Sequence, residues 1–449
     1  MWSDMLASMR ELTTPDGPST ALLTDHYELT MLQAALDAGT ADTPCLFEMF
    51  GRRLPAGRRY GVVAGTGRFL EGLSRFRFGD AELRFLRDTG VVSEDALDWL
   101  ADYRFSGTIR GYREGDVYFP GSPLLIVEAS FAEAVILETL ALSVYNYDSA
   151  VAAAASRMSG VARGRPLAEM GSRRTNESSA VAAARAAVVA GFSSTSNLEA
   201  GRRYGLRTIG TSAHSFTLLH PTEEDAFRAQ INSLGADTTV LLDTYDVDAA
   251  LETAVRIAGP NLGGVRLDSG DLGIQAAEVR EKLDALGAHN TTITVTSDLD
   301  EYAIASLASA PVDSYGVGTR LVTGSGAPSA NLVYKLTARQ DDEGTWHSVA
   351  KKAAGKGSHG GLKTARRVLS GGTATQEAIG VPHLPDGVGE GRDLQVDFVV
   401  DGEIDDSFTG PEAVVRAQEM HRAAMAELPR SARRLQEGDP TIPTIFYDA

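Results

Sequence analysis

The residues best suited to chemistry begin in the segment 206–216, which reads Leu-Arg-Thr-Ile-Gly-Thr-Ser-Ala-His-Ser-Phe. Its apolar start is typical of the end of a buried strand, and Gly210 lets the backbone turn. Hydroxyl-bearing residues then flank one imidazole, that of His214. Because the side chains before the histidine are small, a phosphorylated ligand can approach the backbone closely. Taken alone, the segment also fits a histidine with a purely structural role.

Five other apolar runs are followed by polar segments of the same character. Arginine guanidinium groups bind phosphate oxygens in a fork, and glycine-rich loops at helix starts offer backbone N–H groups to phosphate. Aspartates bind ribose hydroxyls or hold Mg²⁺ through water. Caps and turns explain any one segment but not the arginines, so the set predicts a site for phosphate and sugar. The residues, with those of the first segment, are Gly171, Ser172, Arg173 and Arg174; Gly210, Thr211 and His214; Asp243, Thr244, Tyr245 and Asp246; Arg266, Asp268, Ser269, Gly270 and Asp271; Ser297 and Asp298; and Gly318, Thr319 and Arg320.

Arg266 stands inside an apolar run, where a charge needs a reason. Alternation along a strand places Arg266 and Asp268 on the same face. Two interpretations stay open. One is a buried salt bridge between them, and the other is a guanidinium stacked on an aromatic ligand beside a carboxylate that holds a sugar.

The elements that must position these residues follow a regular rhythm. Between residues 165 and 320, short apolar runs alternate with helical patterns, which predicts a parallel β-sheet. Seven or so repeats favour a closed or nearly closed α/β barrel, whose chemistry lies on the loops after the carboxyl ends of the strands. The candidate strands are 167–170, 191–193, 208–209, 238–242, 264–267, 292–296 and 313–317, and the clearest helices are 178–190, 222–234, 247–258, 272–286 and 299–308.

The segments on either side of this repeat are richer in β patterns. We therefore predict three parts, beginning with a flexible N-terminal arm at 1–20. A mixed α+β domain is expected from 21–130 plus 331–449, and an α/β barrel catalytic domain from 131–330. The glycine- and lysine-rich loop 351–363 has no role that the sequence reveals.

Composition limits the class of protein. The chain has 449 residues, 43% of them hydrophobic, and a net charge of −18, which disfavours nucleic acid and anionic membranes as partners. No run reaches about 18 uninterrupted apolar residues, so no transmembrane helix is expected. With Cys45 as the single cysteine, no disulfide is possible within one chain, and the simplest location is the cytoplasm.

A helix is expected near the N-terminus, from about Asp25 to Gly39. Asp25 and Glu28 have the spacing of a capping box. Tyr27 falls in the first turn, where a tyrosine either packs against the core or stacks on a ligand.

In combination, these segments resemble the nicotinate phosphoribosyltransferase family. The matches run in family order over residues 21–370 and are specific only as a set. They are Thr24-Asp-His-Tyr-Glu-Leu-Thr-Met31, Gly171-Ser-Arg-Arg174, Gly210-Thr-Ser-Ala-His-Ser215, Leu242-Asp-Thr-Tyr-Asp246, Arg266-Leu-Asp-Ser-Gly-Asp-Leu272 and Gly316-Val-Gly-Thr319.

The resemblance implies a fold, an assembly and a reaction. The fold is an irregular α/β barrel of the type II phosphoribosyltransferase kind, with the mixed domain built from both chain ends. The assembly is a homodimer with shared active sites. The reaction joins nicotinate to 5-phosphoribosyl-1-diphosphate, giving nicotinate mononucleotide and diphosphate for pyridine nucleotide salvage and NAD biosynthesis. ATP hydrolysis is coupled through a phosphohistidine, which makes the enzyme a ligase by classification, and Mg²⁺ is required.

The resemblance also implies roles for individual residues. His214 would be phosphorylated, with Asp243 as its orienting carboxylate, and Asp268 would act in catalysis and hold Mg²⁺ through water. Arg266 and Thr211 would bind nicotinate, with Tyr27 of the partner subunit on the other face of the ring. The remaining substrate-binding residues would be Arg173, Ser269, Ser297, Asp298, Gly316, Gly318 and Thr319.

Ser196 bears on the choice between nicotinate and nicotinamide. The resemblance implies that related nicotinamide enzymes have an aspartate here, whereas Ser196 offers no carboxylate to repel that of nicotinate. Two departures stand out. Met170 replaces the stacking phenylalanine of nicotinamide-using relatives, and the loop 359–363 matches the family pattern only partly.

Two alternatives remain for the function. Quinolinate phosphoribosyltransferase is also a barrel that acts on a pyridine carboxylate, but it needs basic residues for a second carboxylate and has no use for a phosphorylated His214. A non-catalytic nucleotide-binding regulator on the same scaffold would bind the mononucleotide tightly without turnover.

Overall fold

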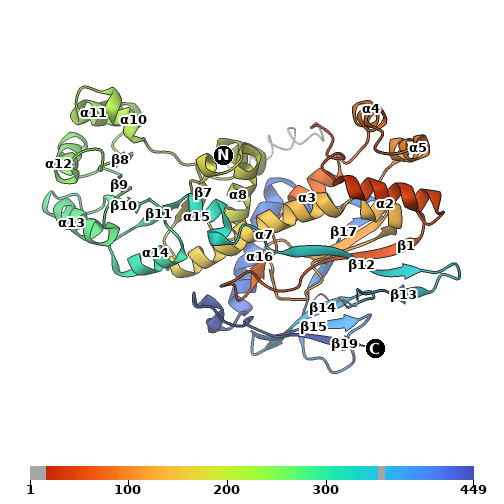
Figure 1. Ribbon diagram of the computed structural model, residues 1–449. Coiled ribbons are helices and arrows are strands. Elements are labelled where there is room, and N and C mark those ends of the chain that lie inside the picture. Colours follow the sequence, from red (N-terminus) through yellow and green to blue (C-terminus); the bar gives the residue numbers. More distant parts are fainter. Residues whose placement is uncertain (1–16, 352–358, 449) are drawn as a thin grey trace. The chain divides into compact units, whose positions relative to one another are not determined.

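The computed structural model describes residues 17–351 and 359–448 (Figure 1). Most of the predicted arm, 1–16, and most of the loop 351–363 lie outside these ranges. Contacts divide the chain into two compact units, one formed by Met1–Ala153 with Ala327–Ala449 and the other by Ala154–Gly326. The domain boundaries expected from the sequence, at 130 and 331, stay predictions, because a division by contacts does not test which segments fold independently.

The second unit is built on a six-stranded sheet in the order β7-β6-β11-β10-β9-β8. All its ladders are parallel, and a further parallel bridge, Thr195 to Thr208, extends the edge beyond β7. No ladder among the described residues joins β8 to that bridge, so the barrel is irregular. The strands are β6 (Leu167–Glu169), β7 (Ser194–Thr195), β8 (Thr239–Leu241), β9 (Gly264–Leu267), β10 (Thr292–Val295) and β11 (Ser314–Val317).

Helices alternate with these strands, which confirms the predicted α/β class with a parallel sheet. The strand expected at 208–209 is reduced to one bridge, and the strand expected at 191–193 lies slightly later, as β7. The helices are α8 (Glu177–Val189), α9 (Leu198–Tyr204), α10 (His214–Leu219), α11 (Glu223–Leu234), α12 (Val247–Ala258), α13 (Leu272–Ala285), α14 (Glu301–Ser306) and α15 (Thr319–Val322).

The sheet is held by the burial of its apolar runs. Val265 and Leu267 of β9 and Ile293 and Val295 of β10 have no exposed surface. Continuous apolar strands of this kind are typical of parallel sheets covered on both faces. The loops after the strands start the helices, because Asp246 accepts a hydrogen bond from the N–H of Ala249 and caps α12. Some strand-end aspartates therefore have a structural role.

The first unit is organised around a seven-stranded sheet in the order β13-β12-β1-β5-β3-β17-β18. Figure 1 shows strands from both ends of the chain side by side in it, as the antiparallel β1–β12 and β3–β17 ladders require. Its strands are β1 (Pro44–Gly51), β3 (Thr108–Tyr112), β5 (Leu125–Ser130), β12 (Leu332–Gln340), β13 (Trp346–Ser348), β17 (Gln395–Val400) and β18 (Glu403–Ile404).

Two smaller sheets complete the first unit. The four-stranded one has the order β16-β14-β15-β19, with β14 (Thr364–Ser370), β15 (Thr373–Val381), β16 (Gly391–Asp393) and β19 (Thr444–Asp448), and the other pairs β2 (Gly61–Val62) with β4 (Val117–Tyr118). The helices of this unit are α2 (His26–Asp37), α3 (Thr66–Leu73), α4 (Asp80–Thr89), α5 (Glu94–Asp102), α6 (Phe131–Val135) and α16 (Gly410–Glu427). The long helix α7 (Glu138–Val161) contributes residues to both units. A large apolar core joins α2–α7 to the seven-stranded sheet. No helix in the described ranges is both long and apolar enough to span a bilayer.

Candidate active site

The predicted site residues of the second unit gather at one edge of its parallel sheet. Each lies at or just after the carboxyl end of a strand, where a barrel carries its functional loops. These residues are Arg173 after β6, Ser196 after β7, Thr211 and His214 after the bridge at Thr208, Asp243 after β8, Arg266, Asp268 and Ser269 at the end of β9, Ser297 and Asp298 after β10, and Gly316, Gly318 and Thr319 at the end of β11.

Arg266 contacts the loop that precedes His214. Its guanidinium donates to Thr211 Oγ1 at 2.5 Å and to the carbonyl of Ser212 at 3.2 Å. It therefore engages this loop and not Asp268 as a direct hydrogen-bond partner. Burial lowers the pKa of Arg266, while the nearby carboxylates of Asp268 and Asp243 oppose that shift. Its Nε is buried without a partner, which leaves a donor for a ligand.

Two aspartates from neighbouring strand ends are linked to each other. Asp243 Oδ2 accepts from the backbone N–H of Asp268 at 3.1 Å and from Ser269 Oγ at 2.6 Å. Asp268 in turn accepts a hydrogen bond from the hydroxyl of Thr296. The other oxygen of Asp243, Oδ1, is buried and has no partner. A buried carboxylate oxygen without a donor is costly, so this atom is suited to a cation or to a ligand hydroxyl.

His214 is the first residue of α10 and is half-buried. Its Nδ1 lies 3.2 Å from Thr244 Oγ1. The hydrogen-bonded neighbour of the imidazole is thus Thr244, while the orienting role of Asp243 stays a prediction. Thr244 is one of the polar residues that the sequence places after a strand, but the sequence predicts no individual role for it.

The ends of β6, β10 and β11 are tightly packed. A Cβ added to Gly316 would lie 2.6 Å from Met170 Sδ and 2.6 Å from Thr296 Cγ2. Gly316 is therefore required by close packing, and Met170, the departure noted in the sequence, borders β11. Ser297 has a φ of 109°. A serine in this left-handed region is strained, and such strain is concentrated at functional sites.

Two acidic or basic residues have roles that the sequence reasoning missed. Glu169, the last residue of β6, is fully buried and bonded to two loops. The signal was available, because an acid inside an apolar run, two residues before Gly171, is as unexpected as the arginine in β9. Lys363 is also buried, with its Nζ 2.5 Å from Glu48 Oε2, so in the first unit it serves as an internal ion pair.

Tyr27 belongs to the first unit, near the start of α2. It is 46% exposed, so it is not a core residue. Partial burial and the carboxylate of Glu138 raise the pKa of its hydroxyl. The capping box expected from Asp25 is wrong, because no side chain caps α2. Glu28 instead accepts hydrogen bonds from the Thr24 hydroxyl and from Thr139 at the start of α7.

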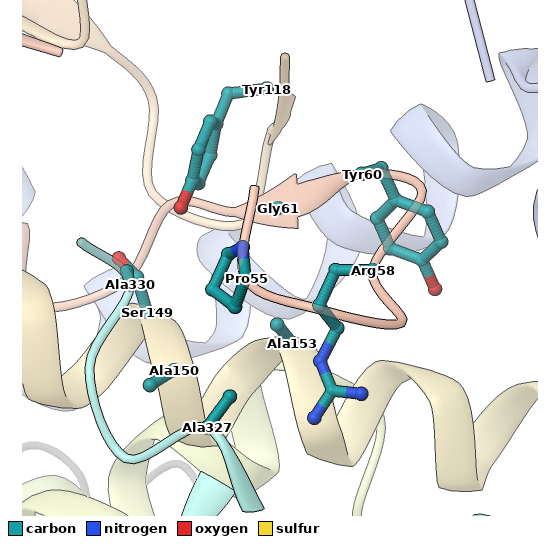
Figure 2. Close-up of a pocket in the computed structure, with 10 residues that line it drawn as sticks. All are labelled: Pro55, Arg58, Tyr60, Gly61, Tyr118, Ser149, Ala150, Ala153, Ala327 and Ala330. Atoms are coloured by element: carbon teal, nitrogen blue, oxygen red, sulfur yellow. The ribbon is translucent and has the colours of Figure 1, made fainter. Parts of the chain in front are cut away.

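A small pocket in the first unit is a separate feature. Figure 2 shows it bordered by Pro55, Arg58 and Tyr60, with Ala150 and Ala153 of α7 facing them. No strand-end residue of the second unit lines it. None of the predicted site residues lines this pocket, so we place the candidate active site at the sheet edge.

Known proteins share both the sequence and the fold. Residues 22–146 match the nicotinate phosphoribosyltransferase N-terminal domain, and 166–376 match the nicotinate phosphoribosyltransferase family. The chain is 50% identical to nicotinate phosphoribosyltransferase pncB1 of Mycobacterium tuberculosis over 98% of both chains. It is 36% identical to the nicotinate phosphoribosyltransferase of Bacillus subtilis over 72% of this chain and 68% of that protein.

A solved structure supports the same family by its fold. The crystal structure of human nicotinic acid phosphoribosyltransferase superposes with a TM-score of 0.78 at 25% identity, covering 94% of this chain and 97% of the human one. The fold and this likeness define the class of phosphoribosyltransferases built on an α/β barrel. Within that class, the chain belongs to the nicotinate phosphoribosyltransferase family, which confirms the resemblance and decides against the quinolinate alternative.

Proposed function

We propose that this protein joins nicotinate to 5-phosphoribosyl-1-diphosphate, coupled to ATP hydrolysis. The pyridine nitrogen of nicotinate forms a bond to ribose C1, the bond from C1 to the diphosphate oxygen breaks, and nicotinate mononucleotide is formed. Family membership supports the reaction. The observation that carries its location is the cluster at the sheet edge, in which Arg266 donates to Thr211 and lies within electrostatic range of the hydrogen-bonded pair Asp243 and Asp268.

The transfer requires that both substrates are held in position and that the charge developing on the ribose is stabilised. Departure of diphosphate leaves positive charge on the ribose ring, which a nearby carboxylate stabilises. Asp268, held by Thr296, is placed to do so or to bind ribose hydroxyls. Arg266 pairs with the nicotinate carboxylate or lies against its ring, with the hydroxyl of Thr211 beside it. Arg173, whose positive charge lowers the pKa of Arg266, receives phosphate.

The residues fit Mg²⁺ only in part. The described residues contain no group of three acidic, histidine or cysteine side chains that would hold a metal ion. Asp243 and Asp268 supply two carboxylates, one with an unpartnered oxygen. Mg²⁺ commonly binds one or two carboxylates together with substrate phosphates and water. It would therefore be held by Asp268 through water and by diphosphate, whose negative charge it neutralises.

ATP acts through His214 in this proposal. A ring nitrogen forms a bond to the γ-phosphorus, the bond to the ADP oxygen breaks, and water later removes the phosphoryl group as phosphate. While it is present, the phosphohistidine adds negative charge beside Thr244 and the strand ends. That charge changes the affinity of neighbouring loops for substrates.

Incubation with labelled ATP tests this. We expect an acid-labile, base-stable phosphate on His214, found by peptide mapping, and loss of the label when nicotinate and 5-phosphoribosyl-1-diphosphate are added. Turnover of nicotinate without any labelled histidine would contradict the ATP step but leave the transfer reaction standing. Tight binding of the mononucleotide without turnover would instead support the regulator alternative.

The proposed assembly is a homodimer with shared sites, in which the exposed Tyr27 of one subunit completes the nicotinate site of the other. Mixing two inactive chains tests it, one carrying Tyr27→Ala and one Arg266→Ala. Shared sites restore part of the activity, because some mixed dimers contain one intact site. No recovery after subunit exchange, shown by mass measurement, would contradict a shared site.

A further inference from the structure

Glu169 is an acid in the middle of the parallel sheet. It ends β6, where it pairs with Val317 of β11 on one side and Thr195 of β7 on the other. It has no exposed surface, and burial raises its pKa. A buried carboxylate is expensive, so it persists where its hydrogen bonds are useful.

Both oxygens of this carboxylate accept hydrogen bonds, one from the loop after β6 and the other from the end of β7. One accepts from the backbone N–H of Gly171, two residues before Arg173. The other accepts from Thr195 Oγ1 at 2.5 Å. In addition, the backbone carbonyl of Glu169 accepts from the N–H of Ser196 at 2.8 Å. One residue therefore holds the start of the Arg173 loop and the turn that carries Ser196.

A second connection closes the network. Thr195 Oγ1 accepts from the backbone N–H of Asn197 at 2.9 Å. The side chain of Asn197 then donates to Ser172 Oγ at 3.0 Å. Ser172 directly precedes Arg173, so the bonds run from Glu169 through the β7 turn and return to the loop after β6. Closed networks of this kind hold their members in one geometry.

We infer that Glu169 is a positioning residue that couples the phosphate-binding loop of Arg173 to the substrate-selecting turn of Ser196. Nicotinate and the phosphoribosyl substrate must be held together in one orientation for the transfer. The carboxylate acts through those loops and touches neither substrate. This rests on the proposed function, in which Arg173 receives phosphate, and on the substrate-selecting role that the resemblance implies for Ser196.

Thr195→Val tests the coupling without a buried charge change. It removes the hydroxyl but keeps the shape, and Thr195→Ser restores the hydroxyl. The matched control is Thr291→Val, because Thr291 is also buried and its hydroxyl donates to the carbonyl of Leu262 at 2.7 Å, at the amino end of β10. Thr291→Val loses one buried hydrogen bond, whereas Thr195→Val loses two, the one donated to Glu169 and the one accepted from Asn197, so Thr195→Val should lower stability more.

A positioning role and a purely structural role predict different kinetics. For Thr195→Val we expect KM to rise for both substrates by at least about fivefold, the effect of a single lost buried hydrogen bond, with Thr195→Ser near the wild type. Thr291→Val should lower Tm without changing either KM. Glu169→Gln should shift both KM values in the same direction. Its amide can accept only one of the two hydrogen bonds, and loss of the other disturbs the network that joins both loops. If the Glu169→Gln protein does not fold, Thr195→Val decides.

Unchanged KM values in a folded Thr195→Val protein, whatever its loss of Tm, would overturn the inference. A rise in only one KM would also overturn it, because coupling requires both loops to move. If the wild type does not turn over nicotinate, the proposed function fails instead. Calorimetric titration with 5-phosphoribosyl-1-diphosphate then measures binding at the Arg173 loop without turnover. Weaker binding in Thr195→Val than in the wild type would support the positioning role, and equal binding would refute it.

Discussion

The carboxylate of Asp243 accepts a hydrogen bond from the backbone N–H of Asp268 at 3.1 Å, which ties the carboxyl end of β8 to that of β9. The two acids are 25 positions apart in sequence. Only the parallel pairing of β8 with β9 brings them together. The arrangement places two negative charges beside Arg266 and leaves Asp243 Oδ1 buried without a partner.

Asp243→Asn should therefore remove a charge while keeping the shape. The asparagine oxygen still accepts from the N–H of Asp268, and the amide nitrogen takes the place of the unpartnered oxygen, where it cannot bind a cation. We expect about a hundredfold lower kcat/KM for 5-phosphoribosyl-1-diphosphate and a higher Mg²⁺ requirement, comparable to losing one electrostatic contact to developing charge. Steady-state kinetics over a Mg²⁺ series measures both.

The control is Ser269→Ala, which removes only the hydroxyl bonded to Asp243 at 2.6 Å. One lost neutral donor should cost less than about tenfold. Equal effects of Asp243→Asn and Ser269→Ala would mean that Asp243 only organises the loop.

His214→Ala should separate ATP hydrolysis from the transfer of the phosphoribosyl group to nicotinate. We expect loss of ATP stimulation but continued slow synthesis without ATP, because the transfer itself needs no phosphohistidine. Product formation with and without ATP measures this. Thr244→Val, which removes only the hydroxyl 3.2 Å from the ring, should keep some stimulation. ATP stimulation in His214→Ala equal to that of the wild type would refute the assignment.

Ser196→Asp should weaken nicotinate binding strongly. A carboxylate at this position would repel the carboxylate of the substrate, and like charges held a few ångströms apart cost on the order of 1–4 kcal/mol, or about 5- to 1000-fold in KM. Ser196→Asn is the uncharged control and should change KM far less. A nicotinate KM in Ser196→Asp that matches Ser196→Asn would count against this placement.

The acid sensitivity of the first unit should depend on His421. This buried histidine has its Nδ1 3.0 Å from the carbonyl of Gly115, and burial lowers its pKa from 6.5 to about 4, with Asp116 opposing. Between those values the unfolded chain binds a proton that the folded chain does not. Stability is therefore fully present above pH 6.5 and is lost as pH falls toward 4, by up to about 3 kcal/mol.

His421→Asn provides the comparison, because its amide keeps a donor for Gly115 without titrating. Denaturant unfolding from pH 4 to 7 should show a shallower slope of unfolding free energy against pH in this variant. Parallel slopes for the two proteins would show that His421 is not responsible.

Gly316→Ala should destabilise the second unit. The new Cβ would meet Met170 and Thr296 at 2.6 Å each, and overpacking of this kind costs about 1–3 kcal/mol. Gly160→Ala in α7 is the matched variant, because nothing lies within 4 Å of its added Cβ, and alanine favours the helix by about 1 kcal/mol. Opposite signs of the two changes in Tm are expected. A stable Gly316→Ala protein would mean that Met170 repacks.

Much of the fold was visible in the sequence, because apolar runs alternating with helical patterns leave little choice but a parallel sheet. Its details were less accessible. The strand expected at 208–209 is only a bridge to Thr195, and the length of a strand depends on pairing across the sheet, which the local pattern does not show. Asp25 had the right spacing for a cap, yet the structure gives Glu28 the larger role, bonded to Thr139 more than 100 positions away.

The sequence by itself determined which residue types stand at the strand ends, because side-chain chemistry and the order of strands are local properties. Tertiary structure alone decided the partners: Thr211 for Arg266, Asp268 for Asp243, Thr244 for His214, and both loops for Glu169. Hydrogen bonds depend on distances of about 3 Å. Strand register sets those distances, and register follows from packing across the whole sheet.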